Sequence, residues 1–131
     1  MALTQIVNDG LGASLTATSD GGAVTTSVQQ GLAKAWAFVD GTGTVALRDS
    51  FNTTSLTDNS TGNYTVSWTN SMSSANYAAS LTTSDSGNGN DRWMTANYPH
   101  ATGSLRGNSR NSGATAYDSD GHSYIATGDL A

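Results

Sequence analysis

The 131-residue sequence contains no cysteine, no glutamate, one proline and one lysine. Without cysteine, neither a disulfide nor a thiolate zinc site can stabilise the fold. The five basic residues are scattered, so no basic stripe exists to follow phosphates, and we expect no nucleic-acid binding. There is also no long apolar run and no charged-then-apolar leader at Met1. We therefore expect neither membrane insertion nor a secretory signal, and synthesis and assembly in a cytoplasm.

Charge is scarce as well. Only 11% of residues are charged, the formal net charge is −5, and 36% of residues are hydrophobic. Low charge separates this chain from highly charged disordered tails, and its abundant Ser, Thr, Asn and Gly leave few strong helix formers. Thr, Val and the aromatics suit a pleated surface. The composition predicts a polar, all-β protein with a small core.

Residues 35–77 carry the clearest pattern, with large apolar side chains at every second position. Period two predicts strands, because successive side chains of an extended chain point to opposite faces. Residues 40–43 (DGTG) and 58–63 (DNSTGN) interrupt the pattern with turn residues that accept positive φ, which predicts a meander of antiparallel strands. We expect the aromatics to fill the sheet core rather than to form a sugar-stacking platform. The alternating residues are Trp36, Phe38, Val45, Leu47, Tyr64, Val66 and Trp68.

The predicted fold class is all-β: a small antiparallel β-sandwich or jelly-roll-like module of about eight strands over residues 33–131, preceded by an extended N-terminal arm over residues 1–32. A core this small, without disulfides, favours stabilisation by partner subunits, which would also cover the sheet edges. We expect a homotrimer.

The N-terminal arm holds a short apolar group, Leu3, Ile6 and Val7, ahead of a Gly/Ser/Thr/Ala-rich run. Such a segment has too few large side chains for its own core. We interpret it as an arm that docks on another protein or winds with its copies from neighbouring subunits. The alternative is a floppy leader.

Residues 84–111 form the least regular region and contain the single proline, Pro99. Loops on a rigid β scaffold commonly carry recognition, so this region is a possible recognition loop; the alternative is a solvated connector. Trp93 follows a Gly/Asn-rich run, and we expect it to pack on a neighbouring subunit, with stacking on a glycan as the alternative. The candidate recognition residues are Arg92, Trp93, Tyr98, His100, Arg106 and Arg110.

One cluster of residues suggests a metal site, because Asp118, Asp120 and His122 would share one face of an extended segment. Oxygen-rich turns of this kind can hold Ca²⁺, but a full calcium loop requires further acidic ligands and a closing glutamate, which this sequence lacks. A turn between two strands explains the same residues. These three are therefore only weak metal candidates, and we expect no metal and no other cofactor. Neither a paired-carboxylate nor a nucleophile-elbow pattern supports catalysis, so we expect no enzyme.

From Gly31 to the C-terminus the sequence resembles a module found in structural genes of tailed bacteriophages, notably those infecting marine bacteria. The similar stretches are residues 31–36 (GLAKAW), 40–45 (DGTGTV), 48–52 (RDSFN), 56–59 (LTDN), 61–66 (TGNYTV), 75–77 (ANY) and 125–131 (IATGDLA).

The resemblance implies a structural protein on the virion surface: a capsid decoration protein, a head fibre or a small tail fibre. The implied partners are other virion proteins, either the major capsid protein or a tail protein. The resemblance carries no catalytic residues. A carbohydrate-binding module that recognises a host surface glycan for adsorption is the alternative function.

Overall fold

The computed structural model describes residues 16–18, 25–87 and 91–131. The chain divides into two compact units, Met1–Leu32 and Ala33–Ala131. In the first unit, β1 (Thr16–Thr18) pairs with β2 (Thr25–Ser27) in an antiparallel hairpin, and the short helix α1 (Val28–Gly31) follows. The predicted docking residues Leu3, Ile6 and Val7 lie outside the described residues. No helix among the described residues is both long and apolar enough to cross a membrane.

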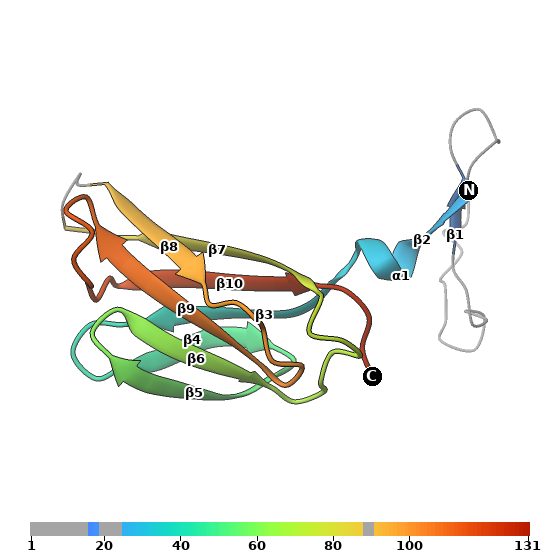
Figure 1. Cartoon of the computed structure of the whole chain (residues 1–131), viewed down its shortest axis with the longest axis horizontal. Coiled ribbons are helices and arrows are strands. Elements are labelled where there is room, and N and C mark those ends of the chain that lie inside the picture. The colour runs from blue at the N-terminus through green and yellow to red at the C-terminus, as the bar shows by residue number, and fades with distance from the viewer. Residues whose placement is uncertain (1–15, 19–24, 88–90) are drawn as a thin grey trace, which may run out of the picture. The chain divides into compact units, whose positions relative to one another are not determined.

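The second unit is the predicted antiparallel β-sandwich of eight strands. Its elements are β3 (Ala33–Asp40), β4 (Ala46–Phe51), β5 (Thr53–Ser60), β6 (Asn63–Trp68), β7 (Ala78–Ser84), β8 (Arg92–Ala96), β9 (Ser104–Asn111) and β10 (Gly121–Thr127). One sheet has the order β4-β3-β10-β7, and the other has the order β5-β6-β9-β8. Figure 1 shows the sheets as two layers, with β4 and β5 along one side and β7 and β8 along the other.

The predicted meander is broken at one place. β3 pairs with β4 and β5 pairs with β6, as expected for successive hairpins, but β4 and β5 belong to different sheets. Only Asn52 separates these two strands, and its φ of 54° turns the chain from one layer into the other. The corner at Asn52 therefore converts a flat meander into a sandwich.

The core lies between the two sheets and is built from alternating residues, as period two requires. In β6 the buried residues are Tyr64, Val66 and Trp68, which confirms the predicted core positions of these three. In β10, Tyr124 and Ala126 are fully buried. The other members of the apolar core are Ala35, Ala37, Val39, Met72, Tyr77 and Leu105.

The predicted core positions of Trp36 and Phe38 are wrong. Strand β3 buries its small residues, Ala35, Ala37 and Val39, and turns its two aromatics to the outer face of the sheet, where Phe38 is 39% exposed. The physical reason is volume, because Tyr64 and Tyr124 already fill the interior and leave room only for small side chains opposite them.

The expected loop over residues 84–111 is also different, because it contains two strands, β8 and β9. The two strands pair antiparallel, with Trp93 opposite Arg110 and Ala96 opposite Gly107. The connection between them, with a cis bond at Tyr98-Pro99, has the irregular backbone that the sequence predicts, as do residues 85–87 after β7.

Candidate functional site

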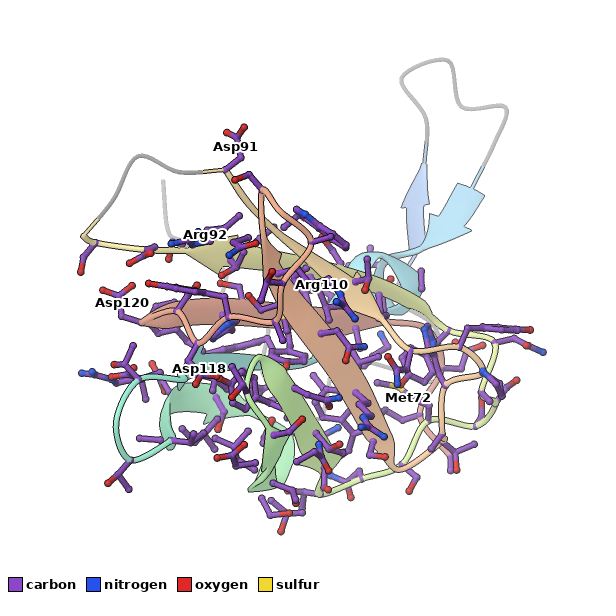
Figure 2. All side chains as sticks on the ribbon, turned by 60° about the vertical axis from the view of Figure 1, so that its left-hand side comes forward. Met72, Asp91, Arg92, Arg110, Asp118 and Asp120 are labelled. Carbon is purple, nitrogen blue, oxygen red and sulfur yellow. The ribbon has the colours of Figure 1, made fainter. Side chains whose placement is uncertain are left out.

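The acidic segment before β10 does not gather its side chains around one point. Asp118 accepts hydrogen bonds from the Gly62 N–H at 2.6 Å and from the Tyr64 hydroxyl. Asp120 accepts the Ser86 N–H with both carboxylate oxygens, at 3.1 and 3.2 Å. Figure 2 shows both aspartates at the end of the sandwich opposite to Met72. Each carboxylate thus fixes a different neighbouring turn.

His122, the third residue of that cluster, points into the interior and is fully buried. Its ring lies 4.9 Å from the Tyr64 ring. Burial lowers the pKa of His122, while the Val39 backbone and the Asp118 carboxylate act in the opposite direction. Among the described residues, no group of three histidine, cysteine or acidic side chains could hold a metal ion. Asp118 and Asp120 thus act as hydrogen-bond acceptors for neighbouring backbone, in the segment that leads from β9 in one sheet to β10 in the other.

Asp40 anchors the turn between β3 and β4. Its carboxylate accepts the Thr42 N–H at 2.9 Å, the Thr42 hydroxyl at 2.7 Å and the Arg48 guanidinium. The Arg48 and Thr42 hydrogen bonds lower the pKa of Asp40 to about 2. The Asp40 carboxylate therefore belongs to the turn, and its hydrogen-bond partners all lie within the same fold.

Arg92, a predicted recognition residue, also makes its side-chain contacts within the fold. Its side chain is only 7% exposed, donates to Asp85 at 3.0 Å and lies over the Tyr117 ring with its guanidinium carbon 3.7 Å from the ring centre. An ion pair and a cation–π contact hold the mostly buried guanidinium in place at this end of the sandwich. The guanidinium ties β8 to the end of β7 and to the segment before β10, so it has little surface to offer a partner.

The other predicted recognition residues lie in two separate places. Trp93, Arg106 and Arg110 stand on the outer face of the sheet β5-β6-β9-β8, where Arg110 donates to the Ala114 carbonyl and Arg106 to the Asn63 amide, both at 2.7 Å. Trp93 is 41% exposed. Tyr98 and His100 lie instead in the connection between β8 and β9.

Tyr98 is 81% exposed, and its ring centre is 6.0 Å from that of His100 in an edge arrangement. His100 in turn packs against Tyr77 in a tilted arrangement, with ring centres 4.8 Å apart. The six predicted residues therefore do not form one recognition loop. Arg92 is structural, three residues share a sheet face, and two belong to a small aromatic cluster.

A different surface gathers exposed apolar side chains, and the sequence analysis did not single it out. On the outer face of the sheet β4-β3-β10-β7, Phe51, Trp36 and Ile125 stand in one row across three neighbouring strands. Phe51 is 55% and Ile125 43% exposed, Trp36 is partly exposed, and Phe38 lies next to them on β3. We call Trp36, Phe38, Phe51 and Ile125 the apolar face.

The sequence allows the apolar face as one of two possible orientations of its strands. The alternation of Ala35 and Ala37 with Trp36 and Phe38 fits two opposite assignments, aromatics inside or aromatics outside. The run GHSYIATG around Ile125 has the same ambiguity, because Tyr124 and Ile125 are adjacent and cannot both point inward.

No family model matches the chain, and neither the curated proteins nor the solved structures include a match.

Proposed function

We propose that this chain is a structural protein of a tailed-phage particle, displayed on the particle surface as a homotrimer, without enzymatic activity. It acts as a capsid decoration protein, a head fibre or a small tail fibre, is made in the host cytoplasm and is incorporated into the virion. The single observation that carries this proposal is the apolar face. A soluble sandwich that leaves contiguous aromatic and aliphatic side chains on one outer face is typical of a subunit that functions in an assembly.

The intramolecular hydrogen bonds and ion pairs of the charged side chains support the same proposal. Asp118, Asp120, Asp40 and Arg92 each make hydrogen bonds or ion pairs that hold turns and strand ends together. These charged groups make the turns and strand ends rigid, and a subunit of a particle needs a rigid fold. The resemblance to phage structural modules supplies the kind of particle, and residues 1–32 are the proposed docking arm for a capsid or tail protein.

Two measurements test this proposal. Sedimentation of the purified chain at micromolar concentration is expected to give the mass of a trimer, and a monomer would contradict it. Gold-labelled antibody on particles of the phage that encodes the chain is expected to decorate the capsid or the tail, and particles without label would exclude a virion role. Loss of capsid association after removal of residues 1–30 would favour the decoration role over the tail fibre role.

Trp93 favours a second candidate function, recognition of a host surface glycan. Its exposed indole stands in register with Arg110, whose guanidinium is fixed by the Ala114 carbonyl. An exposed aromatic ring beside fixed polar groups suits a sugar, which has an apolar face and hydroxyl edges. A glycan array probed with the full chain tests this alternative.

A further inference from the structure

The outer face of the sheet β5-β6-β9-β8 is positively charged, although the chain as a whole has a formal net charge of −5. Arg106 and Arg110 stand on this face, because the residues that alternate with them in β9 are buried. Of the residues in the four strands, all of which the structure describes, only Asp58 is acidic, and it lies in register with the buried Tyr64. Asp91 lies just before β8, and Figure 2 shows it apart from Arg110.

Among the described residues, neither of these two arginines pairs with a carboxylate. Arg106 donates its Nε–H to the side-chain oxygen of Asn63, and Arg110 donates an Nη1–H to the Ala114 carbonyl, both at 2.7 Å. Both acceptors are neutral, so they orient the guanidinium groups without cancelling their charge. The other donors of each group include a parallel pair, Nη1 and Nη2 in Arg106 and Nε and Nη2 in Arg110. Such a pair matches the two oxygens of a carboxylate.

Trp93 places an aromatic ring next to one of these charges. It lies opposite Arg110 in the ladder between β8 and β9 and is 41% exposed. Directly opposed residues on one face of an antiparallel pair have Cβ atoms about 4.5–5.5 Å apart, so the indole and the guanidinium can contact the same ligand group. An aromatic ring suits the apolar face of a sugar, and a guanidinium suits a carboxylate. Together they fit a sugar that carries a carboxylate.

A row of polar side chains extends this surface across the sheet. Asn59 donates to the Thr65 hydroxyl at 2.9 Å and to the side-chain oxygen of Asn63 at 3.3 Å. The same Asn63 oxygen accepts the Arg106 Nε–H. Amide and hydroxyl groups held by one another in this way can exchange hydrogen bonds with the hydroxyls of a sugar.

We infer that this sheet face binds an acidic oligosaccharide, with the Trp93 indole on a sugar ring and the Arg110 guanidinium on the carboxylate of that sugar. Arg106 lies four strand residues from Arg110, about 13 Å, so it contacts a different sugar unit. The inference rests on the second candidate function, glycan recognition, and names the class of glycan: one that contains uronic or sialic acids. Two arginines are too few to follow a phosphate backbone, which separates this ligand from a nucleic acid.

A glycan array tests the charge requirement when each acidic oligosaccharide is printed beside its carboxyl-reduced form. Reduction keeps the ring and the hydroxyls and removes the negative charge. The full chain is expected to bind the uronic-acid or the sialic-acid oligosaccharides at least about tenfold more strongly than their reduced forms, in line with the strength of hydrogen bonds to a charged group. Added salt is expected to weaken the binding, because exposed charges are screened.

Three variants locate the binding on the sheet face. Trp93→Ala and Arg110→Gln are expected to abolish the array signal, and Arg106→Gln is expected to weaken it about tenfold. Arg48→Gln is the matched control, because it removes the same charge from β4 in the other sheet, where Arg48 pairs with Asp40. The control is expected to bind like the wild type. Far-UV circular dichroism of every variant checks that the sandwich is still folded.

Four outcomes would overturn the inference. Equal binding to the acidic and the reduced forms would exclude the charge requirement and leave glycan recognition in place. An equal loss in Arg48→Gln and Arg110→Gln would show that the charge of the whole chain matters, not this face. Binding to heparin or to DNA as strong as binding to the acidic sugars would show a general attraction of polyanions. No signal on any glycan, neutral ones included, would exclude both the inference and glycan recognition.

Discussion

The side chain of Asn52 is joined to Asn70 by three hydrogen bonds. Its Nδ2 donates to the Asn70 carbonyl at 3.0 Å, and its Oδ1 accepts the backbone N–H and the side-chain Nδ2 of Asn70 at 2.7 and 3.1 Å. The same Nδ2 also donates to the Lys34 carbonyl at 3.0 Å. Asn52 has a φ of 54° between β4 and β5, a conformation that asparagine tolerates better than most residues. One side chain thus fixes the corner at which the chain changes sheets.

Replacement of this residue should destabilise the sandwich as a whole. Asn52→Ala loses the four hydrogen bonds and keeps a Cβ atom at positive φ, so we expect the free energy of unfolding to fall by about 2–3 kcal/mol. Urea unfolding followed by tryptophan fluorescence measures the change.

Asn52→Gly is the matched control for that variant. It loses the same hydrogen bonds but removes the Cβ atom, and it should cost less than alanine because glycine adopts positive φ without steric penalty. Equal stability of the alanine variant and the wild type would show that the corner does not depend on this side chain.

Gly62 and Gly43 give a second comparison, because both have positive φ, 65° and 61°. A Cβ atom on Gly62 would lie 2.5 Å from the Ser109 carbonyl oxygen and 2.8 Å from the Tyr117 nitrogen, whereas a Cβ atom on Gly43 would meet nothing within 4 Å. We expect Gly43→Ala to cost about 1 kcal/mol from backbone strain alone. Gly62→Ala should cost about 3 kcal/mol or more, since backbone atoms must also move. Thermal melting of the two variants side by side checks the order.

The strand pattern of this protein is predictable from the sequence, but the orientation of β3 is not. In β6, Tyr64, Val66 and Trp68 alternate with polar residues, so only one face can be apolar. In β3 every residue from Ala35 to Val39 is apolar, and either set could point inward. Tyr64 and Tyr124 on other strands determine which set of β3 residues points inward. The positions of these tyrosines depend on strand pairings between segments that are distant in the sequence.

Strand β9 is hard to predict for the opposite reason. Its buried residues are Leu105, Gly107 and Ser109, of which only the first is a large apolar residue. A Cβ atom on Gly107 would contact the side chains of Met94 and Leu81, so large residues on neighbouring strands fill this part of the core. A strand whose inward residues are glycine and serine has no hydrophobic period, and it therefore looks like a loop in the sequence.

The stability of the sandwich should fall in acid in two stages. Burial holds the pKa of His122 below its usual 6.5. Just below pH 6.5, the imidazole therefore binds a proton in the unfolded chain but stays neutral in the native chain. Stability contributed by the neutral imidazole is therefore lost as the pH falls below about 6.5. The pKa of Asp40 is lowered from 3.8 to about 2 by Arg48 and Thr42, so its contribution is present above pH 3.8 and is lost between pH 3.8 and 2.

Urea midpoints measured from pH 7.5 down to about pH 2 check both stages. His122→Gln should remove the loss that begins below pH 6.5, because glutamine does not titrate, and should leave the stage below pH 3.8 in place. A wild-type midpoint that stays constant from pH 7.5 to 5 would contradict the first stage.

Trp93 distinguishes the two proposed functions. Its indole is 41% exposed on β8, whereas the apolar face lies on the other sheet. The proposed assembly through the apolar face thus takes the place of the contact between Trp93 and a neighbouring subunit that the sequence suggested. Trp93→Ala is therefore expected to keep the trimer and to change the free energy of unfolding by less than about 1 kcal/mol. If the chain binds a host glycan through this ring, the wild type gives a glycan-array signal that Trp93→Ala abolishes while sedimentation stays the same. If the chain acts through assembly alone, neither protein gives a signal, and Phe51→Ser, which alters the apolar face, shifts the trimer toward monomer.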